Sequence, residues 1–406
     1  MDRKSTTNLG SVIEINPASI SKHYHYDEIE YVDISSIDTG SFSGSTRMPL
    51  TEAPSRAKRL VEHGDTILAT VRPNLRWFLF IKNPPENMVV STGFAVLHPS
   101  NKIDARFLYY TVTDQKFTDY LTANAKGSAY PAVDTETIAR AEISFPTLET
   151  QQKIASILSA YDDLIENNLQ RIKILEEMAQ TLYREWLVKF RFPGHQKVKM
   201  VNSPLGKILE GWEIKNLFEL ADVTYGFPFK SSLFNVNREG TPVVRIRDVL
   251  DGQSATFTTE DAPDKYIVHD GDFLVGMDGD FHMGFWAGGT AFLVQRVARF
   301  RPRGDIGRYG LALALKEPIE HFNKTITGTT VAHLGDNHLR TINMMMPDKR
   351  LLKVINDILE PLLDFQLNIR AKNKNLRQTR DLLLPKLISG ELDVSELNIT
   401  IPEAKA

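Results

Sequence analysis

The 406-residue chain contains no cysteine, and its charges nearly cancel, with 48 Lys and Arg residues against 51 Asp and Glu residues. The lack of cysteine excludes disulfides, thiolate metal ligands and cysteine nucleophiles, and it fits a reducing compartment such as the cytoplasm. No stretch approaches the ~20 apolar residues of a membrane span, and the N-terminal segment has no apolar signal-peptide core. The net charge of −3 argues against a uniformly basic protein but allows a local basic face.

Motifs of nucleotide-hydrolysing and methyl-transferring enzymes are missing as well. The ATP-binding string Gly-x4-Gly-Lys-Ser/Thr does not occur. Asn83-Pro-Pro-Glu86 resembles the Asn-Pro-Pro-aromatic loop of adenine methyltransferases, but it lacks the aromatic residue that stacks on the flipped base, and no Gly-rich cofactor loop precedes it. Asp278, Asp280 and His282 fit a glycine-rich turn better than a metal site. The sequence therefore predicts no catalytic residue, no metal ligand and no cofactor in this chain.

Residues 150–190 contain neither glycine nor proline and are rich in residues that favour helices. Apolar residues recur there alternately four and three positions apart, which is the spacing of a coiled-coil seam. At 1.5 Å per residue such a helix extends over about 60 Å. Asn168 is a polar seam position suited to fixing the register. The predicted apolar seam residues are Ile154, Leu158, Tyr161, Ile165, Ile172, Leu175 and Leu182.

A second seam begins at Ile355, which lies 201 positions after Ile154 (355 − 154 = 201). This copy is less regular, because prolines at 361 and 385 are expected to kink it. Its polar seam positions are Gln366, Asn373 and Arg380, and its predicted apolar seam residues are Ile355, Leu359, Leu362, Ile369, Leu376 and Leu383. A long helix with one apolar stripe needs a partner, so we expect the two helices to form an intramolecular coiled coil.

The order of the shorter elements also repeats. The matched strings include two Gly-Asp turns that lead into buried strands, and a helix is expected near Asp104–Leu121. Neither half alternates strand and helix regularly, so the sequence predicts an α+β fold with a pseudo-two-fold internal repeat. The matched strings are 31–37 with 243–249, 61–68 with 268–275, 127–133 with 328–334, and 142–146 with 343–347.

These patterns predict five segments. They are a mixed domain at 1–149, a long helix at 150–191, a linker with a second mixed domain at 192–347, a second long helix at 348–392, and a tail at 393–406.

Two strand-rich domains that alternate with two equivalent long helices resemble the specificity subunit of type I restriction-modification systems. The resemblance covers nearly the whole chain, although the first half lacks a Gly-Trp opening. The local strings that carry it are Phe145–Ile154, Leu384–Leu392, Gly211-Trp-Glu, Arg72-Pro-Asn74 and Met277-Asp-Gly-Asp280.

The resemblance implies a function. Each mixed domain would be a target recognition domain that reads one part of a split, asymmetric double-stranded DNA target. The helices would pack antiparallel, hold the domains apart and dock two methyltransferase (modification) subunits, which two restriction subunits join in the full complex. S-adenosylmethionine, Mg2+ and ATP are expected on those partners, and this chain would be non-catalytic and cytoplasmic, with no membrane contact.

DNA recognition needs cations for phosphates and forked donors for base edges. Each such residue alone fits a solvated loop charge better than a DNA contact, but the sets in the two halves favour a DNA face. The preferred DNA contacts are the turn Arg72–Arg76 and the loops at Gly127 and Gly328. The candidates are Arg47, Arg72, Asn74, Arg76, Lys126, Ser128 and Tyr130 in the first domain, and Arg245, Arg247, Thr329, Thr330 and His333 in the second. The further candidate cations are Arg56, Lys58, Arg59, Arg299, Arg301, Arg303 and Arg308.

Two alternatives remain at this point. One is a fusion of methyltransferase and specificity functions in one enzyme, against which the missing cofactor loop argues. The other is a structural adaptor whose coiled coil joins proteins without binding DNA.

Overall fold

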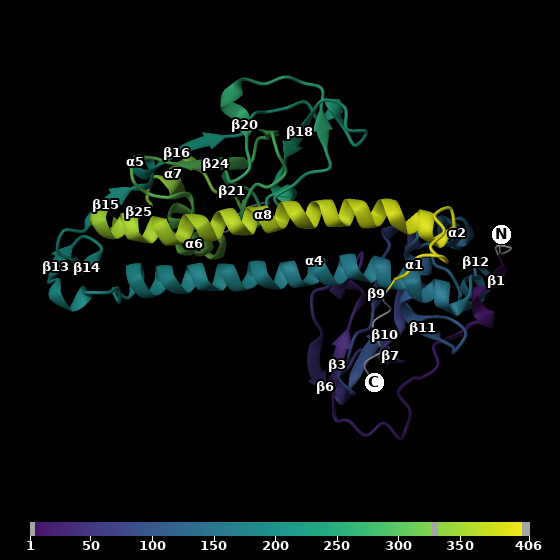
Figure 1. The fold of residues 1–406 in the computed structure, drawn as a ribbon. Helices are drawn as coiled ribbons and strands as arrows, with labels where there is room; N and C mark the ends of the chain where they lie inside the picture. The colour runs from purple at the N-terminus through teal and green to yellow at the C-terminus, as the bar shows by residue number, and fades with distance from the viewer. Residues whose placement is uncertain (1–4, 327–331, 400–406) are drawn as a thin grey trace. The chain divides into compact units, whose positions relative to one another are not determined.

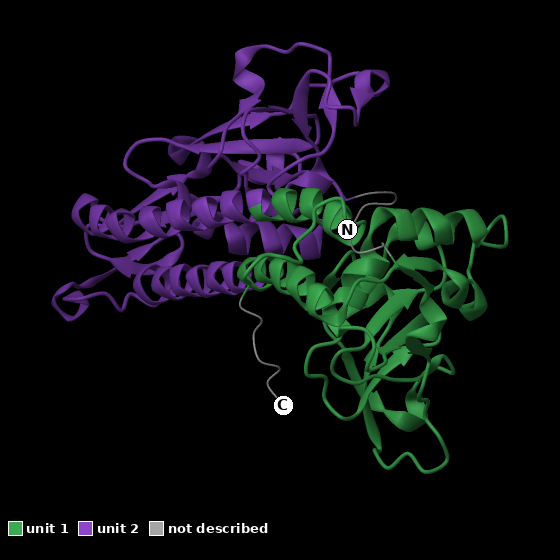
Figure 2. Ribbon diagram, turned by 45° about the vertical axis from the view of Figure 1, so that its right-hand side comes forward, with its two compact units in different colours: residues 1–165, 376–406 green, residues 166–375 purple. Residues whose placement is uncertain are grey.

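The computed structural model describes residues 5–326 and 332–399. The chain forms two compact units, one of residues 1–165 and 376–406 and the other of residues 166–375 (Figure 2). Part of each long helix belongs to each unit. The candidates Thr329 and Thr330 lie outside the described residues.

The first unit contains two four-stranded sheets, of order β2-β11-β8-β9 and β6-β3-β10-β7. Within them β3 and β10 pair in parallel, and the other neighbours are antiparallel. Two-stranded pairings join β1 with β12 and β4 with β5. The strands are β1 (Thr6–Asn8), β2 (Ile13–Ile15), β3 (Glu28–Val32), β4 (Ile37–Asp38), β5 (Ser41–Phe42), β6 (Thr46–Pro49), β7 (Ala57–Leu60), β8 (Thr66–Ala69), β9 (Phe78–Phe80), β10 (Met88–Ser91), β11 (Phe94–Pro99) and β12 (Glu142–Ser144).

The second unit has a four-stranded sheet of order β16-β24-β21-β22 and a five-stranded sheet of order β17-β19-β18-β23-β20. Here β18 and β23 are the parallel pair. Two-stranded pairings join β13 with β14 and β15 with β25, and β25 leads into the second long helix (Figure 1). The strands are β13 (Met200–Ser203), β14 (Gly206–Leu209), β15 (Glu213–Asn216), β16 (Ala221–Tyr225), β17 (Phe234–Asn235), β18 (Thr241–Val244), β19 (Phe257–Thr258), β20 (Ile267–Val268), β21 (Phe273–Gly276), β22 (Met283–Phe285), β23 (Ala291–Leu293), β24 (Val297–Pro302) and β25 (Asn343–Met346).

The two units share one topology, which confirms the internal repeat. The order β2-β11-β8-β9 is matched by β16-β24-β21-β22, and the parallel pair β3–β10 is matched by β18–β23. The Gly-Asp turns lead into the buried strands β8 and β21, as the sequence predicts. In each turn the aspartate accepts the backbone N–H three residues earlier, at 2.7 Å for Asp65 and 2.8 Å for Asp272.

The shorter helices differ between the units. The single helix expected near Asp104–Leu121 is wrong, because the chain is extended at Asp114 (φ −63°, ψ 144°) and forms two helices. The β-branched run Thr111–Thr113 and an aspartate at a capping position favour this break. The helices are α1 (Ala105–Thr113), α2 (Gln115–Asn124) and α3 (Thr135–Arg140) in the first unit, and α5 (Leu217–Leu220), α6 (Arg308–Thr325) and α7 (Asp336–Leu339) in the second.

The long helices are α4 (Leu148–Tyr183) and α8 (Lys349–Ile388). A π-helical turn at Arg184–Val188 continues α4, so the α-helix itself ends before the predicted residue 191. Neither Pro361 nor Pro385 ends α8. All thirteen predicted apolar seam residues are buried or half-buried, in the four-three rhythm that the sequence shows.

The two helices run antiparallel. In the second unit Asn168 Nδ2 donates to Asn373 Oδ1 at 2.8 Å, and Arg370 pairs with Glu176 at 3.1 Å. Residue numbers thus rise along one helix as they fall along the other. This confirms the predicted antiparallel coiled coil.

The polar seam positions of α8 all have partners. Asn373 and Asn168 are 2% and 6% exposed and bond to each other. Gln366 donates to the Tyr309 hydroxyl of α6 at 3.0 Å, and in the first unit Arg380 pairs with Asp162 of α4. A buried amide without a partner costs about 1–3 kcal/mol. These bonds therefore explain how the seam tolerates polar residues.

Side chains of the long helices hold the start of the domain helices. In the first unit Gln151 Oε1 of α4 accepts the backbone N–H of Asp104 at 2.9 Å, just before α1. In the second unit Asn356 Oδ1 of α8 accepts the N–H of Gly307 at 3.1 Å, just before α6. These bonds satisfy N–H groups that helix termini leave without intrahelical partners. Each mixed domain is thereby attached to its own long helix.

The asparagine pair can be tested with leucine substitutions. Asn168→Leu removes the donor to the buried Asn373 amide and should lower the free energy of unfolding by about 1–3 kcal/mol. Replacing both residues with leucine should recover most of that loss, since no orphaned amide remains. Urea unfolding followed by helical circular dichroism measures the change. Additive losses in the double variant would show that the two side chains act independently.

Candidate nucleic-acid interface

A strained turn follows β8 in the first unit. Pro73–Leu75 form one 3-10 turn, and the residues on either side, Arg72 (φ 48°) and Arg76 (φ 57°), adopt the left-handed conformation. The backbone N–H of Arg72 donates to the carbonyl of Pro131 at 2.7 Å. Non-glycine residues seldom adopt this conformation without local support, and such strain concentrates at functional sites.

The two arginines of this turn point to different surroundings. Arg76 donates to the Thr113 carbonyl at 2.7 Å and to Gln115 Oε1 at 2.9 Å, which ties the turn to the junction of α1 and α2. The Arg72 guanidinium instead lies over the ring of Tyr130, 4.8 Å from its centroid. Asn74 lies between them and is exposed.

A closed loop lies beside the turn. Lys126 and Ala132 exchange backbone hydrogen bonds of 2.8 and 2.9 Å, and Val71 forms a bridge to Ala132. Gly127 has φ 97°, and a Cβ there would approach the Tyr130 carbonyl to 3.1 Å. The loop thus presents exposed Ser128 and Tyr130 next to Arg72, which brings together the two preferred contacts of the first domain.

Two other candidates of the first domain are ion-paired. Lys126 pairs with Asp134 at 3.1 Å, and bonds from the hydroxyl and backbone N–H of Thr137 lower the pKa of the Asp134 carboxyl. Arg47 lies on β6 and pairs with Glu28 of β3. Both cations remain largely exposed, so a phosphate can still approach them.

The second unit repeats the backbone bonds that hold this turn. Gly279 N donates to the Ala332 carbonyl at 2.9 Å and Leu334 N to the Met277 carbonyl at 2.8 Å. In the first unit the equivalent donors are Arg72 N to Pro131 and Val133 N to Thr70. Glycine therefore stands where the first domain has Arg72.

The side chains of this second turn form an acidic and histidine-containing cluster. Asp278 pairs with both Arg296 and His333, so the candidate His333 does lie at the turn. Sequence reasoning did not name Arg296 or Asp278 as part of a nucleic-acid surface. The matched strings of the two halves are 207 residues apart before the Arg72 turn and 201 residues apart at its loop. Applying these two offsets to the turn and the loop of the first domain would have located the equivalent turn at Asp278.

Most other arginines of the second unit hold the framework. Arg299 is 5% exposed and donates to the carbonyls of Ile267 and Lys265, and burial lowers the pKa of its guanidinium. Its burial contradicts the idea that it faces DNA. The other framework pairs are Arg245 with Asp248, Arg301 with Asp272, Arg303 with Asp222, and Arg308 with Glu360 and Asp364. Arg247 is exposed, and no ion pair links it to another residue within 5–326 or 332–399.

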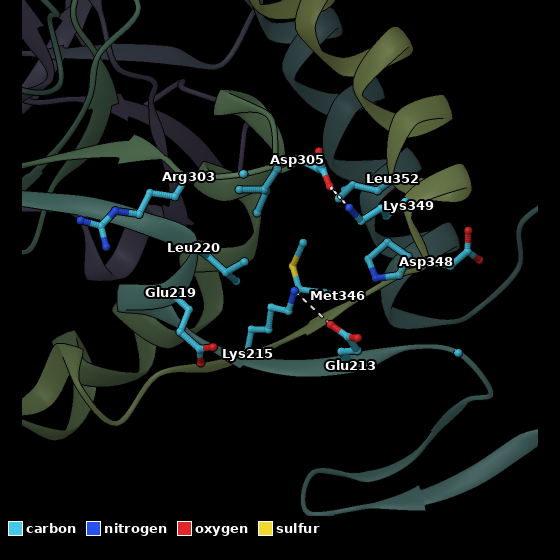
Figure 3. A pocket seen from close by; sticks show the side chains of 14 residues that line it. Glu213, Lys215, Glu219, Leu220, Arg303, Asp305, Met346, Asp348, Lys349 and Leu352 are labelled. Atoms are coloured by element: carbon cyan, nitrogen blue, oxygen red, sulfur yellow. Dashed lines mark ion pairs between the residues drawn. The ribbon is translucent and has the colours of Figure 1, made fainter.

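A pocket of about 450 Å3 lies in the second unit at the start of α8 (Figure 3). Its lining includes Lys215, Arg303 and Lys349. Lys215 pairs with Glu213 at 3.0 Å and Lys349 with Asp305 at 3.3 Å, while Arg303 pairs with Asp222. With its cations compensated, this pocket lacks the free positive charge that a phosphate group would require.

Across 5–326 and 332–399, no three His, Asp or Glu side chains gather as a metal site would need. Over the same residues, none of the helices has the length and apolar character needed to cross a membrane.

The geometry defines a protein with two equivalent mixed domains, each attached to one helix of an antiparallel coiled coil. The family model of the type I restriction modification DNA specificity domain matches residues 1–177 and 209–378. The chain belongs to this family, which confirms the resemblance seen in the sequence.

Individual relatives cover nearly the whole chain. The specificity subunit of the type I restriction enzyme MjaIX of Methanocaldococcus jannaschii is 26% identical over 418 residues, covering 98% of this chain and 94% of that protein. The HindI specificity subunit of Haemophilus influenzae is 22% identical over 435 residues, covering 90% and 95%. The solved S subunit of a type I system from M. genitalium is 16% identical, covers 95% of this chain and 96% of that one, and superposes with a TM-score of 0.55, which supports the fold.

Two arginines of the second unit provide a matched test of framework against surface roles. Arg299→Ala should lower the free energy of unfolding by about 1–3 kcal/mol for each backbone carbonyl that loses its donor. Arg247→Ala should change it by less than about 0.5 kcal/mol, as surface substitutions usually do. Chemical denaturation of both variants measures this. Equal stability of the two variants would contradict the assignment of Arg299 to the framework.

Proposed function

We propose that this chain is the non-catalytic subunit that recognises a bipartite, asymmetric DNA target and directs the methyltransferase and restriction subunits of a type I restriction-modification complex. The observation that carries the proposal is the repeated turn after β8 and β21, with the backbone bonds that hold it. The two domains share these backbone hydrogen bonds but present different side chains, with Arg72 in one and Gly279 at the equivalent position of the other. A repeated scaffold with different reading groups suits two unlike half-sites.

The proposed DNA contacts follow from this arrangement. In the first domain they are centred on the Arg72 turn and the Gly127 loop, with Lys126 and Arg47 as phosphate contacts. In the second domain His333 and Arg247 are the described candidates, and Thr329 and Thr330 keep their assignment from the sequence. Arg245 binds its own Asp248, so we expect its contribution to DNA binding to be small.

The proposed partners are two modification subunits, joined by two restriction subunits in the full complex. Both long helices expose large apolar side chains, which a protein partner bound along the helices would cover. An internal two-fold repeat suits two copies of one partner. These side chains are Leu164, Leu169, Ile174 and Met178 of α4 and Val354, Ile358, Phe365 and Leu382 of α8.

The cofactors of the reaction belong to those partners in this proposal. S-adenosylmethionine would bind the modification subunits, and ATP and Mg2+ would serve the restriction subunits. The chain would act in the cytoplasm, where chromosomal DNA is accessible. Crosslinking of radiolabelled S-adenosylmethionine to the isolated chain would favour the fusion enzyme instead.

DNA binding itself is tested with the chain assembled with its modification subunit. We expect a duplex mobility shift whose affinity falls steeply as salt rises, because phosphate contacts release counterions. Deleting the gene should abolish the associated adenine methylation in the host genome. A complex that shifts no duplex even at low salt would favour the adaptor.

The helices are proposed to set the distance between the half-sites. Duplicating residues 166–172 of α4 together with the facing residues 370–376 of α8 adds one heptad to each helix, about 10 Å of rise. The spacer between half-sites should grow by about three base pairs at 3.4 Å per pair. Sequencing of methylated sites in the host measures the spacer.

The control duplicates the heptad in α4 alone. It leaves the second helix unmatched, so we expect loss of assembly rather than a new spacer. An unchanged spacer in the doubly extended protein would refute the role of the helices as a ruler.

A further inference from the structure

We propose that Arg72 and Asn74 read the edges of a guanine and an adenine in the half-site bound by the first domain, and that Arg76 and Tyr130 position them. This inference rests on the proposed function, since it names the bases that the first domain selects.

The turn that carries the two residues is held in place before any ligand arrives. Both of its flanking residues are left-handed, Pro73 is buried, and the Arg72 backbone is bonded to the Gly127 loop. Arg76 adds bonds to the α1–α2 junction. A side chain on such a support loses little conformational freedom on binding, which favours discrimination between bases over general affinity.

Arg72 and Asn74 differ from Arg47 and Lys126 in having no ion pair. Arg72 has only the Tyr130 ring beneath its guanidinium, and within residues 5–326 and 332–399 neither Arg72 nor Asn74 has an ion pair or a side-chain hydrogen bond. Arg47 and Lys126, in contrast, have carboxylate partners. Stacking on an aromatic ring orients the planar fork of an arginine and leaves its donors free.

The chemistry of the two side chains selects the bases. An arginine fork matches the O6 and N7 acceptors of guanine, and an asparagine amide matches the N6 donor and N7 acceptor of adenine. The Cα atoms of residues two apart lie at most about 7 Å from each other, or about two base-pair steps. The half-site should therefore contain a guanine and an adenine within about three positions.

Arg76 has a different role, because both of its terminal nitrogens donate inside the protein, to Gln115 and to the Thr113 carbonyl. Its contribution is to keep the turn in register with α2, as a positioning residue. Arg76→Ala should reduce selectivity at both bases while leaving the salt dependence of binding unchanged. A phosphate contact would instead lower the slope of log affinity against log salt by about one.

The test is selection from randomised duplexes by the full chain assembled with its modification subunit. Wild type should select a motif with a guanine and an adenine in one half. Arg72→Lys keeps the charge but not the fork, so it should lose about 10- to 100-fold discrimination at the guanine alone. Asn74→Asp should move the preference at the adenine position toward cytosine, whose N4 donor suits a carboxylate.

Matched controls are Arg140→Lys and Asn101→Asp, the same replacements at exposed positions elsewhere in the first unit. They should leave the selected motif unchanged. An unchanged motif in Arg72→Lys and Asn74→Asp, or an equal loss of affinity for all sequences, would overturn the inference while leaving the proposed function standing. Failure of the wild-type complex to select any motif would overturn both.

Discussion

The pairing of α4 with α8 depends on partners for its buried polar side chains as much as on its apolar stripe. An apolar stripe brings two long helices together, but polar side chains in the stripe must each find a partner, since a buried unsatisfied group costs about 1–3 kcal/mol. Asn373 finds Asn168, Gln366 finds Tyr309, and Arg380 finds Asp162. Two of these partners belong to α4, the opposite long helix. The third, Tyr309, belongs to α6, so the polar seam positions also attach the second domain to α8.

The arginines likewise differ in whether their donors have partners inside the protein. Where a guanidinium faces carbonyls or a carboxylate, as at Arg299 and Arg301, its donors are used within the fold. Where it stacks on an exposed ring, as at Arg72, its donors remain available. A count of positive residues along the chain does not separate these two classes, because the partners come from strands and loops distant in sequence.

The two domains show how one backbone supports two specificities. Equivalent hydrogen bonds hold the turn after β8 and the turn after β21, yet Arg72 in the first is replaced by Gly279 in the second. Backbone bonds do not depend on side-chain identity, so they persist in both copies. The surface that each turn presents is then free to differ.

Periodicity along the sequence determined the long helices, their apolar seams and the internal repeat. The spacing of apolar residues is a local property that indicates helices and strands directly. The Gly-Asp turns before β8 and β21 were predictable for the same reason. The break at Asp114 was not predicted, because a β-branched run and a capping aspartate cause it and neither changes the spacing of the apolar residues. Only the tertiary structure decided which cations are free: Arg72 and Arg76 stand four residues apart on one turn, and their different roles follow from Tyr130 and Thr113, which the fold alone brings beside them.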